Sequence, residues 1–190
     1  MTTHTATADL KEDHVFIRRV KAVIDRCHDL IIADAKSVPF EDIGKIADII
    51  EQFVDRFHHH KEESSYFPET EHKTDHFSEE VRKFLIEHEF GRRIAKRIRI
   101  HLDECRGGKD SYEPLARFLK TYSIFIQDHT SKEDVFFSDV EDSKSLNDTE
   151  EGELQEKFAR IKAEWRGRNQ DMYEMLEHLE RASWMGPGKQ

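Results

Sequence analysis

Long stretches in which apolar residues recur every three or four positions are the feature that most limits what this 190-residue chain can form. Residues with this spacing share one face of an α-helix, whereas a half-buried strand needs strict alternation. Glycine and proline, which interrupt helices, number only eight and four. No strand pattern competes with the helical period. We therefore expect an all-α protein.

The apolar stripes predict four long helices and a fifth beyond them, at about residues 9–34, 41–67, 78–107, 112–140 and 154–179. Pro39 and Pro68 are expected to end the first two segments, and Ser78 is expected to cap the third. Four such helices joined by short linkers are typical of an antiparallel four-helix bundle. We expect residues 1–142 to form this bundle. Residues 143–190 are expected to form an acidic linker and a C-terminal amphipathic helix that packs on the bundle or on a partner.

Charge and cysteine content exclude several classes of protein. The formal net charge of −10 argues against nucleic acid as a partner, because phosphate binding needs a basic surface. Cys27 and Cys105 both lie in helical apolar patterns and are expected to be buried free thiols. No signal sequence opens the chain, and no apolar run approaches the roughly 20 residues that cross a bilayer. We expect no membrane association and a cytoplasmic location.

Histidine is abundant, with twelve residues, and four of them continue the apolar stripes. These four are His14, His58, His88 and His129, one on each of the first four predicted helices. Glu62 stands four residues after His58, and Glu133 stands four after His129. Residues four apart lie one turn apart on the same helix face, about 6 Å from each other. The four helices thus carry a lone histidine, a His-x-x-x-Glu pair, a second lone histidine and a second pair.

This alternation predicts a metal centre in the bundle core. A buried ionised carboxylate is costly unless it is paired or bound to a metal. A single stripe histidine is more often a satisfied core residue, and a single His-x-x-x-Glu pair resembles a surface pair. Two pairs and two lone histidines together favour two cations, each held by two imidazoles, with two shared glutamates. Imidazole and carboxylate ligands without thiolate suit iron or manganese, with zinc as an alternative.

Four stretches carry a resemblance to a known family: EDHVFIRRVKAVID, FHHHKEESSYFP, EHEFGRRIAKRI and DHTSKEDVFF. Their order and separations resemble those of hemerythrin-like proteins with an HHE cation-binding domain, over residues 9 to about 140. The resemblance implies a four-helix bundle that holds two non-haem iron ions, joined by an oxo or hydroxo bridge. It implies as metal ligands His14, His58, Glu62, His88, His129 and Glu133.

The chain departs from the oxygen-carrying members of that family at one position. The carriers have a further histidine four residues after the lone histidine of the third helix, but here Arg92 stands four after His88. We therefore expect the fifth imidazole, and the cluster of three histidines on one iron, to be absent. This departure argues against reversible oxygen carriage.

Three assignments stay open at this stage. His59 and Glu63 have the same spacing as His58 and Glu62, and His59 is either an additional ligand or a supporting group. Asp134 is an alternative to Glu133, because the carriers use an aspartate five residues after the histidine. A third open residue is Tyr122, which lies seven before His129 on the same stripe. It is either a core residue or a catalytic group that reaches a bound oxygen atom or the iron.

These patterns predict a protein that binds or reacts with O₂, peroxide or another small diatomic molecule, in oxidative-stress response or small-molecule sensing. One version is an enzyme that consumes peroxide as a catalase does. The alternative is an iron- or oxygen-sensing module without turnover, in which the C-terminal helix contacts a second copy or another protein. A purely structural bundle with zinc or without metal is the third hypothesis.

Overall fold

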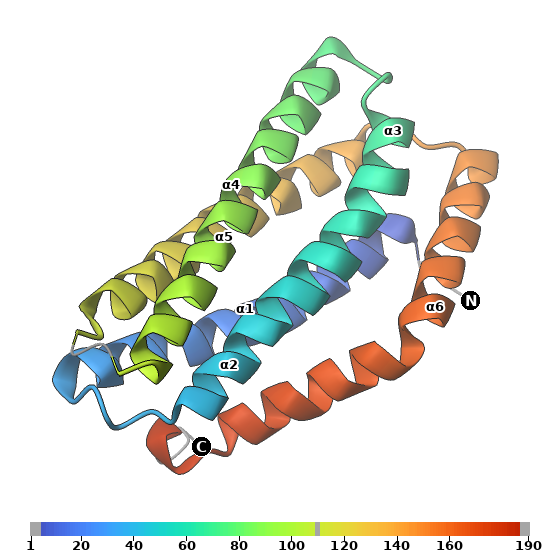
Figure 1. Cartoon of the computed structure of the whole chain (residues 1–190). Coiled ribbons are helices and arrows are strands. Elements are labelled where there is room, and N and C mark those ends of the chain that lie inside the picture. The colour runs from blue at the N-terminus through green and yellow to red at the C-terminus, as the bar shows by residue number, and fades with distance from the viewer. Residues whose placement is uncertain (1–4, 109–110, 187–190) are drawn as a thin grey trace.

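The computed structural model describes residues 5–108 and 111–186, and this part of the chain is all-α, without strands (Figure 1). The elements in chain order are α1 (Ala6–Ala33), α2 (Phe40–Ile49), η1 (Ile50–His59), η2 (Glu62–Tyr66), α3 (Phe67–Thr70), α4 (Asp75–Arg106), α5 (Glu113–Asp142), α6 (Asp148–Glu180) and η3 (Ser183–Met185). The segments from α2 to α3 form one continuous helix. With α1, α4 and α5 it makes the predicted four-helix bundle, and α6 is the predicted additional helix.

Pro68 does not end the second helix, contrary to the prediction. η1 and η2 are π-helical, and the chain stays helical through Pro68 as far as Thr70. In a π-helix each N–H bonds to the carbonyl five residues before it, and here the Phe67 N–H bonds to the Glu62 carbonyl. Proline has no N–H to donate, and here it stands where the π-helical bonding of η2 changes to the α-helical bonding of α3. Pro68 stands in the first turn of α3.

The third helix begins earlier than predicted, because Thr74 rather than Ser78 is its N-cap. The Thr74 hydroxyl accepts a hydrogen bond from the Phe77 N–H at 3.0 Å. α6 also begins earlier, and the acidic linker is only residues 143–147. Asn147 and Glu150 form a reciprocal capping box there, so acidic residues expected in the linker lie in the first turn of the helix.

Two apolar clusters make the core, and a layer of polar residues lies between them. On α1, Leu10 belongs to one cluster and Ile17 to the other, with His14 between them. On α5, Ile126 and Phe136 belong to opposite clusters in the same way. The bundle therefore surrounds a polar layer with hydrophobic packing above and below, and this layer contains the candidate site.

α6 packs against the bundle, which is one of the two predicted alternatives. Its buried residues are Leu154, Phe158, Ile161, Met172, Leu176 and Leu179. Tyr173 on α6 lies 4.5 Å from the ring of Phe16 on α1, and Arg19 of α1 donates two hydrogen bonds to Glu180. Within residues 5–108 and 111–186, no helix is long and apolar enough to cross a membrane.

Asp25 of α1 accepts hydrogen bonds from Lys120 and Ser123 of α5. Its carboxylate should make part of the free energy of unfolding depend on pH. Burial alone would raise its pKa, but hydrogen bonds from Lys21, Lys120 and Ser123 outweigh it and lower the pKa from 3.8 to about 2. A carboxyl with a lowered pKa stabilises the fold above its unfolded pKa, and this contribution is lost as the pH falls toward the folded value. In urea unfolding, the deficit of Asp25→Asn relative to wild type should be full above about pH 4 and should shrink toward pH 2.

The matched control is Asp171→Asn, since Asp171 is exposed on α6. Its stability relative to wild type should change little over the same pH range. A deficit of Asp25→Asn that stays constant down to pH 2 would show that the carboxylate charge is not what these three groups stabilise.

Candidate metal centre

The six residues named as candidate ligands converge in the polar layer, and each is at most 1 % exposed. They are His14 on α1, His58 on η1, Glu62 on η2, His88 on α4, and His129 and Glu133 on α5. They fall into two neighbouring groups of possible metal ligands. One group contains His14, His58, Glu62 and Glu133, with one donor atom of each within 4.8 Å of the others. His88 and His129 belong to the second group.

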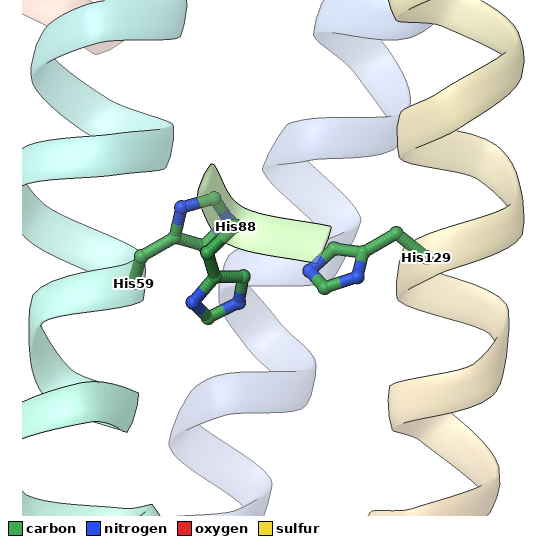
Figure 2. Close-up of side chains that lie close together, drawn as sticks. All are labelled: His59, His88 and His129. Carbon is green, nitrogen blue, oxygen red and sulfur yellow. The ribbon is translucent and has the colours of Figure 1, made fainter. Parts of the chain in front are cut away.

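His59 completes the second group, so three imidazoles lie together here although Arg92 replaces the histidine that the carriers have on the third helix. Donor atoms of His59, His88 and His129 lie within 4.8 Å of one another, and Figure 2 shows their rings converging from three helices. The ring of His59 stacks on that of His88 with centroids 3.8 Å apart. We refer to these residues as the three-histidine cluster. His59 is only 2 % exposed, whereas the next residue, His60, is exposed.

Glu133 contacts both groups. Its Oε1 lies 3.1 Å from Nε2 of His129 and 3.3 Å from Nε2 of His88, while its Oε2 lies 3.4 Å from Nε2 of His14. The neighbouring Asp134 points elsewhere, because its Oδ1 lies 2.8 Å from the outer ring nitrogen of His14, Nδ1. Glu133 therefore reaches the inner nitrogens of both groups, whereas Asp134 contacts the outer nitrogen of His14.

Glu62 spans the two groups from the opposite side. Its Oε1 lies 3.5 Å from Nε2 of His58, and its Oε2 lies 3.4 Å from Nε2 of His88. Burial and the negative charge of Glu133 raise the pKa of Glu62 well above its ordinary value. Two buried carboxylates so close together are ionised at neutral pH only when positive charge lies between them.

The outer nitrogen of each imidazole lies near a carboxylate, which for four of the five comes from a neighbouring helix and for His59 comes from its own helix, η1. Four of these Nδ1–carboxylate contacts are 2.7–3.0 Å long. They join His14 to Asp134, His58 to Asp13, His88 to Glu63, and His129 to Glu87. A fifth, between His59 and Asp55, is 3.6 Å long. Metal-binding histidines generally hold a carboxylate or carbonyl in this way, which fixes the ring and aims the other nitrogen at the metal.

Each of these outer carboxylates is in turn paired with a basic side chain. Arg18 pairs with Asp134, Lys61 with Asp13, Lys132 with Glu87, and Arg92 with both Glu63 and Asp55. Arg92, which stands where the oxygen carriers have their fifth histidine, therefore supports His88 and His59 through their carboxylates. The same pairing around all five imidazoles argues against chance burial of histidine.

Buried polar atoms without partners provide a test of whether these residues fit a metal. Ten such atoms occur in the described part of the chain. Two of them, Nε of Arg26 and Oδ1 of Asn169, lie outside the centre, and the other eight are Nε2 of His14, His58 and His129, both ring nitrogens of His59, both oxygens of Glu62, and Oε2 of Glu133. Unsatisfied buried polar groups are rare and costly in folded proteins. The eight atoms of the centre occur together, and all are atom types that bind transition metals. The residues present therefore fit a cation-binding centre.

Protonation differs across the centre. Burial lowers the pKa of His58 to about 4, and burial with the neighbouring imidazoles lowers that of His59 well below its ordinary value. Both are thus neutral near pH 7, the form in which imidazole binds metals. Burial alone would also lower the pKa of His129, but Glu133 and Glu87 raise it to about 9. The carboxylates around His129 therefore favour positive charge beside them. Without a bound cation, a proton on His129 provides that charge.

Of the phenylalanines Phe57, Phe84, Phe125 and Phe136, the last three belong to an apolar shell around the centre. Phe125 stacks on His129 with centroids 5.3 Å apart, and Phe84 lies 6.0 Å from the same ring. Phe57 differs, because its ring lies 4.7 Å from the Lys61 ammonium instead. It covers the outer charge network and not the imidazoles.

Tyr122 is buried on α5, at 3 % exposure. Burial and the charge of Asp55 raise the pKa of Tyr122 above its ordinary value, so its hydroxyl stays protonated. The role of this residue, in the core or in chemistry, stays a prediction.

The supporting carboxylates were missed by the sequence reasoning, although a signal for them exists. Four of them adjoin a candidate ligand in the sequence and contact the imidazole of a different helix. Asp13 and Glu87 each precede a stripe histidine, whereas Glu63 and Asp134 each follow a stripe glutamate. Acidic residues directly beside stripe ligands are therefore the pattern that could have identified the outer contacts.

Fold and site together define a four-helix bundle whose core holds clusters suited to metal ions. A family model described as the hemerythrin HHE cation-binding domain matches residues 5–140. The chain therefore belongs to this family, as the motifs predicted. Comparison with curated proteins and with solved structures gave no significant match. α6 lies beyond the matched residues.

Proposed function

We propose that the protein binds two non-haem iron ions, joined by an oxo or hydroxo bridge, and reacts with O₂ or peroxide at this centre. The observation that supports this most is the pair of adjacent ligand groups, which Glu62 and Glu133 both span. A carboxylate that reaches both groups is suited to bridging two ions. The proposed ligands are His14, His58, Glu62, His88, His129 and Glu133, with His59 added by its place in the three-histidine cluster.

Iron is favoured by the types of donor atom. The groups contain only imidazole and carboxylate donors, and both cysteines, although buried, lie outside them. Zinc sites of the structural type generally use thiolates, whereas imidazole with carboxylate suits redox-active iron or manganese. Such ions would supply electrons and open coordination positions for a small oxygen species. The protein supplies neutral imidazoles, bridging carboxylates and an aromatic shell that limits access of water.

The two proposed ions have unequal surroundings. Three imidazoles serve one position, and two imidazoles with the shared glutamates serve the other. The argument against an oxygen carrier, which depended on a missing fifth imidazole, no longer applies. Peroxide consumption remains our first proposal, and reversible binding becomes a measurable alternative.

One observation favours a sensing function as the second candidate. A chain of charged groups connects α6 to the centre: Lys162 of α6 bonds to Asp9, and Lys61 lies 2.7 Å from Asp9 and 2.5 Å from Asp13. Asp13 in turn lies 3.0 Å from Nδ1 of His58. A change at His58 can thus alter the contacts of the helix outside the family domain. Such a change would reach a second copy or another protein that α6 contacts.

Oxygen evolution tests the first proposal. Iron-loaded protein should convert two peroxide molecules into two waters and one O₂, as measured with an oxygen electrode. Protein washed with chelator should lose this activity, and iron should restore it. Reversible change of the absorption spectrum on removing oxygen, without oxygen evolution, would instead support sensing or carriage. Iron-loaded protein that shows neither response would contradict the proposed reactivity.

A further inference from the structure

A cavity of about 260 Å³ lies between the second helix and α4 and reaches the three-histidine cluster. At its inner end are His59 and Tyr122, which are both buried. Its mouth is bordered by Arg92, Lys96 and Arg99 of α4 and by acidic residues of the second helix. It therefore links a candidate metal ligand to the protein surface.

The cavity is suited to uncharged molecules. Its walls are formed by small and apolar residues, among them Ala47, Ile50 and Ala95. Two basic groups at the mouth are already paired, since Arg92 lies 2.6 Å from Asp55 and Arg99 lies 2.6 Å from Asp48. The third basic group, Lys96, is exposed at the mouth, so a charged molecule would lose its hydration in the apolar part without gaining a counter-charge there.

The volume exceeds what O₂ or hydrogen peroxide needs. A water molecule occupies about 30 Å³ of liquid, so the space equals roughly eight or nine waters. A molecule of five or six heavy atoms fits such a space. At the inner end, the protonated hydroxyl of Tyr122 and the ring of His59 can form hydrogen bonds. The apolar side chains along the walls cannot.

His59 is the least firmly held of the five imidazoles. Its Nδ1 lies 3.6 Å from the Asp55 carboxylate, whereas the other four outer contacts are 2.7–3.0 Å. Neither of its ring nitrogens has a hydrogen-bond partner among the described residues. Apart from the long contact with Asp55, only stacking and helix packing hold this ring, so it is the imidazole that a molecule in the cavity can most easily displace.

We propose that this cavity, which we call the His59 cavity, admits small uncharged molecules with one hydrogen-bonding end to the three-histidine side of the centre. The inference rests on the proposed function, because it assumes that the cluster holds a metal. It deepens that function by naming the class of molecule and the side of approach. His59 and Tyr122 are the groups that the molecule meets.

Chemical rescue tests this proposal through metal content and melting temperature, without measuring activity. His59→Gly removes an imidazole at the inner end of the cavity and should lower the bound metal and the melting temperature. Free imidazole at millimolar concentration should restore both, because it fits the cavity and can replace the missing ring. The matched variant is His14→Gly. His14 is also a fully buried candidate ligand, but it does not line the cavity. It should lose metal without comparable rescue.

Blocking the cavity should prevent the rescue. With Ala95→Leu added to His59→Gly, restoration should need at least tenfold more imidazole. Ala163→Leu, on the exposed face of α6, should leave the rescue unchanged. Tetrazolate, an anion of nearly the same shape, should rescue poorly. Equal rescue of both glycine variants, insensitivity to Ala95→Leu, or better rescue by the anion would overturn the proposal.

A measurement on the unsubstituted chain keeps the test independent of folding defects. Saturation-transfer NMR should detect imidazole bound to the wild-type protein and to Ala163→Leu, and the signal should fall sharply in Ala95→Leu. Absence of a signal in all three would also overturn the proposal. A wild-type protein that holds no metal but binds imidazole in this way would instead refute the proposed function while retaining the cavity as a binding site.

Discussion

Glu62→Ala is expected to remove most of the bound metal, and Glu133→Ala should do the same. Both carboxylates are fully buried and both reach the two groups of imidazoles, so each substitution removes a ligand from both proposed ions. Metal per chain, measured by mass spectrometry after purification from iron-replete cells, should fall severalfold. His76→Ala is the control, because His76 is exposed on α4, and it should keep the wild-type content.

Glu62 also gives a second test, because a ligand should affect the stability of the metal-free and the metal-loaded protein in opposite directions, whereas a purely structural residue should not. Without metal, both oxygens of Glu62 lack partners and face another buried carboxylate. Glu62→Gln should therefore stabilise the metal-free protein by about 1–3 kcal/mol while it lowers the stability of the metal-loaded protein. Urea unfolding in chelator and in metal measures both. Equal metal content in all variants, or destabilisation in both states, would contradict the ligand assignment.

Lys61→Met is expected to lower the free energy of unfolding substantially, and far more than substitution of an exposed lysine. The Lys61 ammonium is fully buried, lies 2.7 Å from Asp9 and 2.5 Å from Asp13, and contacts the Phe57 ring. Removing one partner of a buried ion pair leaves the other charge uncompensated and typically costs about 3–5 kcal/mol. Urea unfolding of metal-free protein near pH 7 should show a loss of this size.

Metal affinity should fall as well, because Asp13 orients His58. Losing such an outer contact typically costs about 10–100-fold in metal affinity. Lys96→Met, at an exposed position of α4, is the matched control and should change stability by less than about 0.5 kcal/mol. If the two variants are equally stable, the Lys61 network does not support the fold in the way described.

Much of the architecture follows from residue spacing. The period of the apolar stripes depends only on which helix face is buried, so it placed the four bundle helices and α6 to within a few residues for most of their ends. The same geometry brought His14, His58, Glu62, His88, His129 and Glu133 into the polar layer, because residues on a stripe must face the core. Helix starts were less predictable, as Thr74 and Asn147 show, since nearby polar residues compete for the capping position.

His59 could not be placed by the same reasoning. In a regular α-helix, adjacent residues point in directions about 100° apart, so only one of two consecutive histidines faces the core. The π-helical segment η1 widens the helix and lowers the rotation per residue, and His58 and His59 both point inward there. Nothing in the local sequence distinguishes this segment from an α-helix. Its form depends on contacts with the other helices.

Metal analysis of the wild-type protein, combined with absorption spectra in air and under argon, tests the central claim most directly. In the proposed function, cations neutralise and bind the two inward-facing carboxylates and the five imidazoles of the core. The account predicts close to two iron ions per chain and near-ultraviolet and visible absorption typical of bridged ferric ions. Well-folded protein from iron-replete cells that contains no stoichiometric transition metal would contradict it.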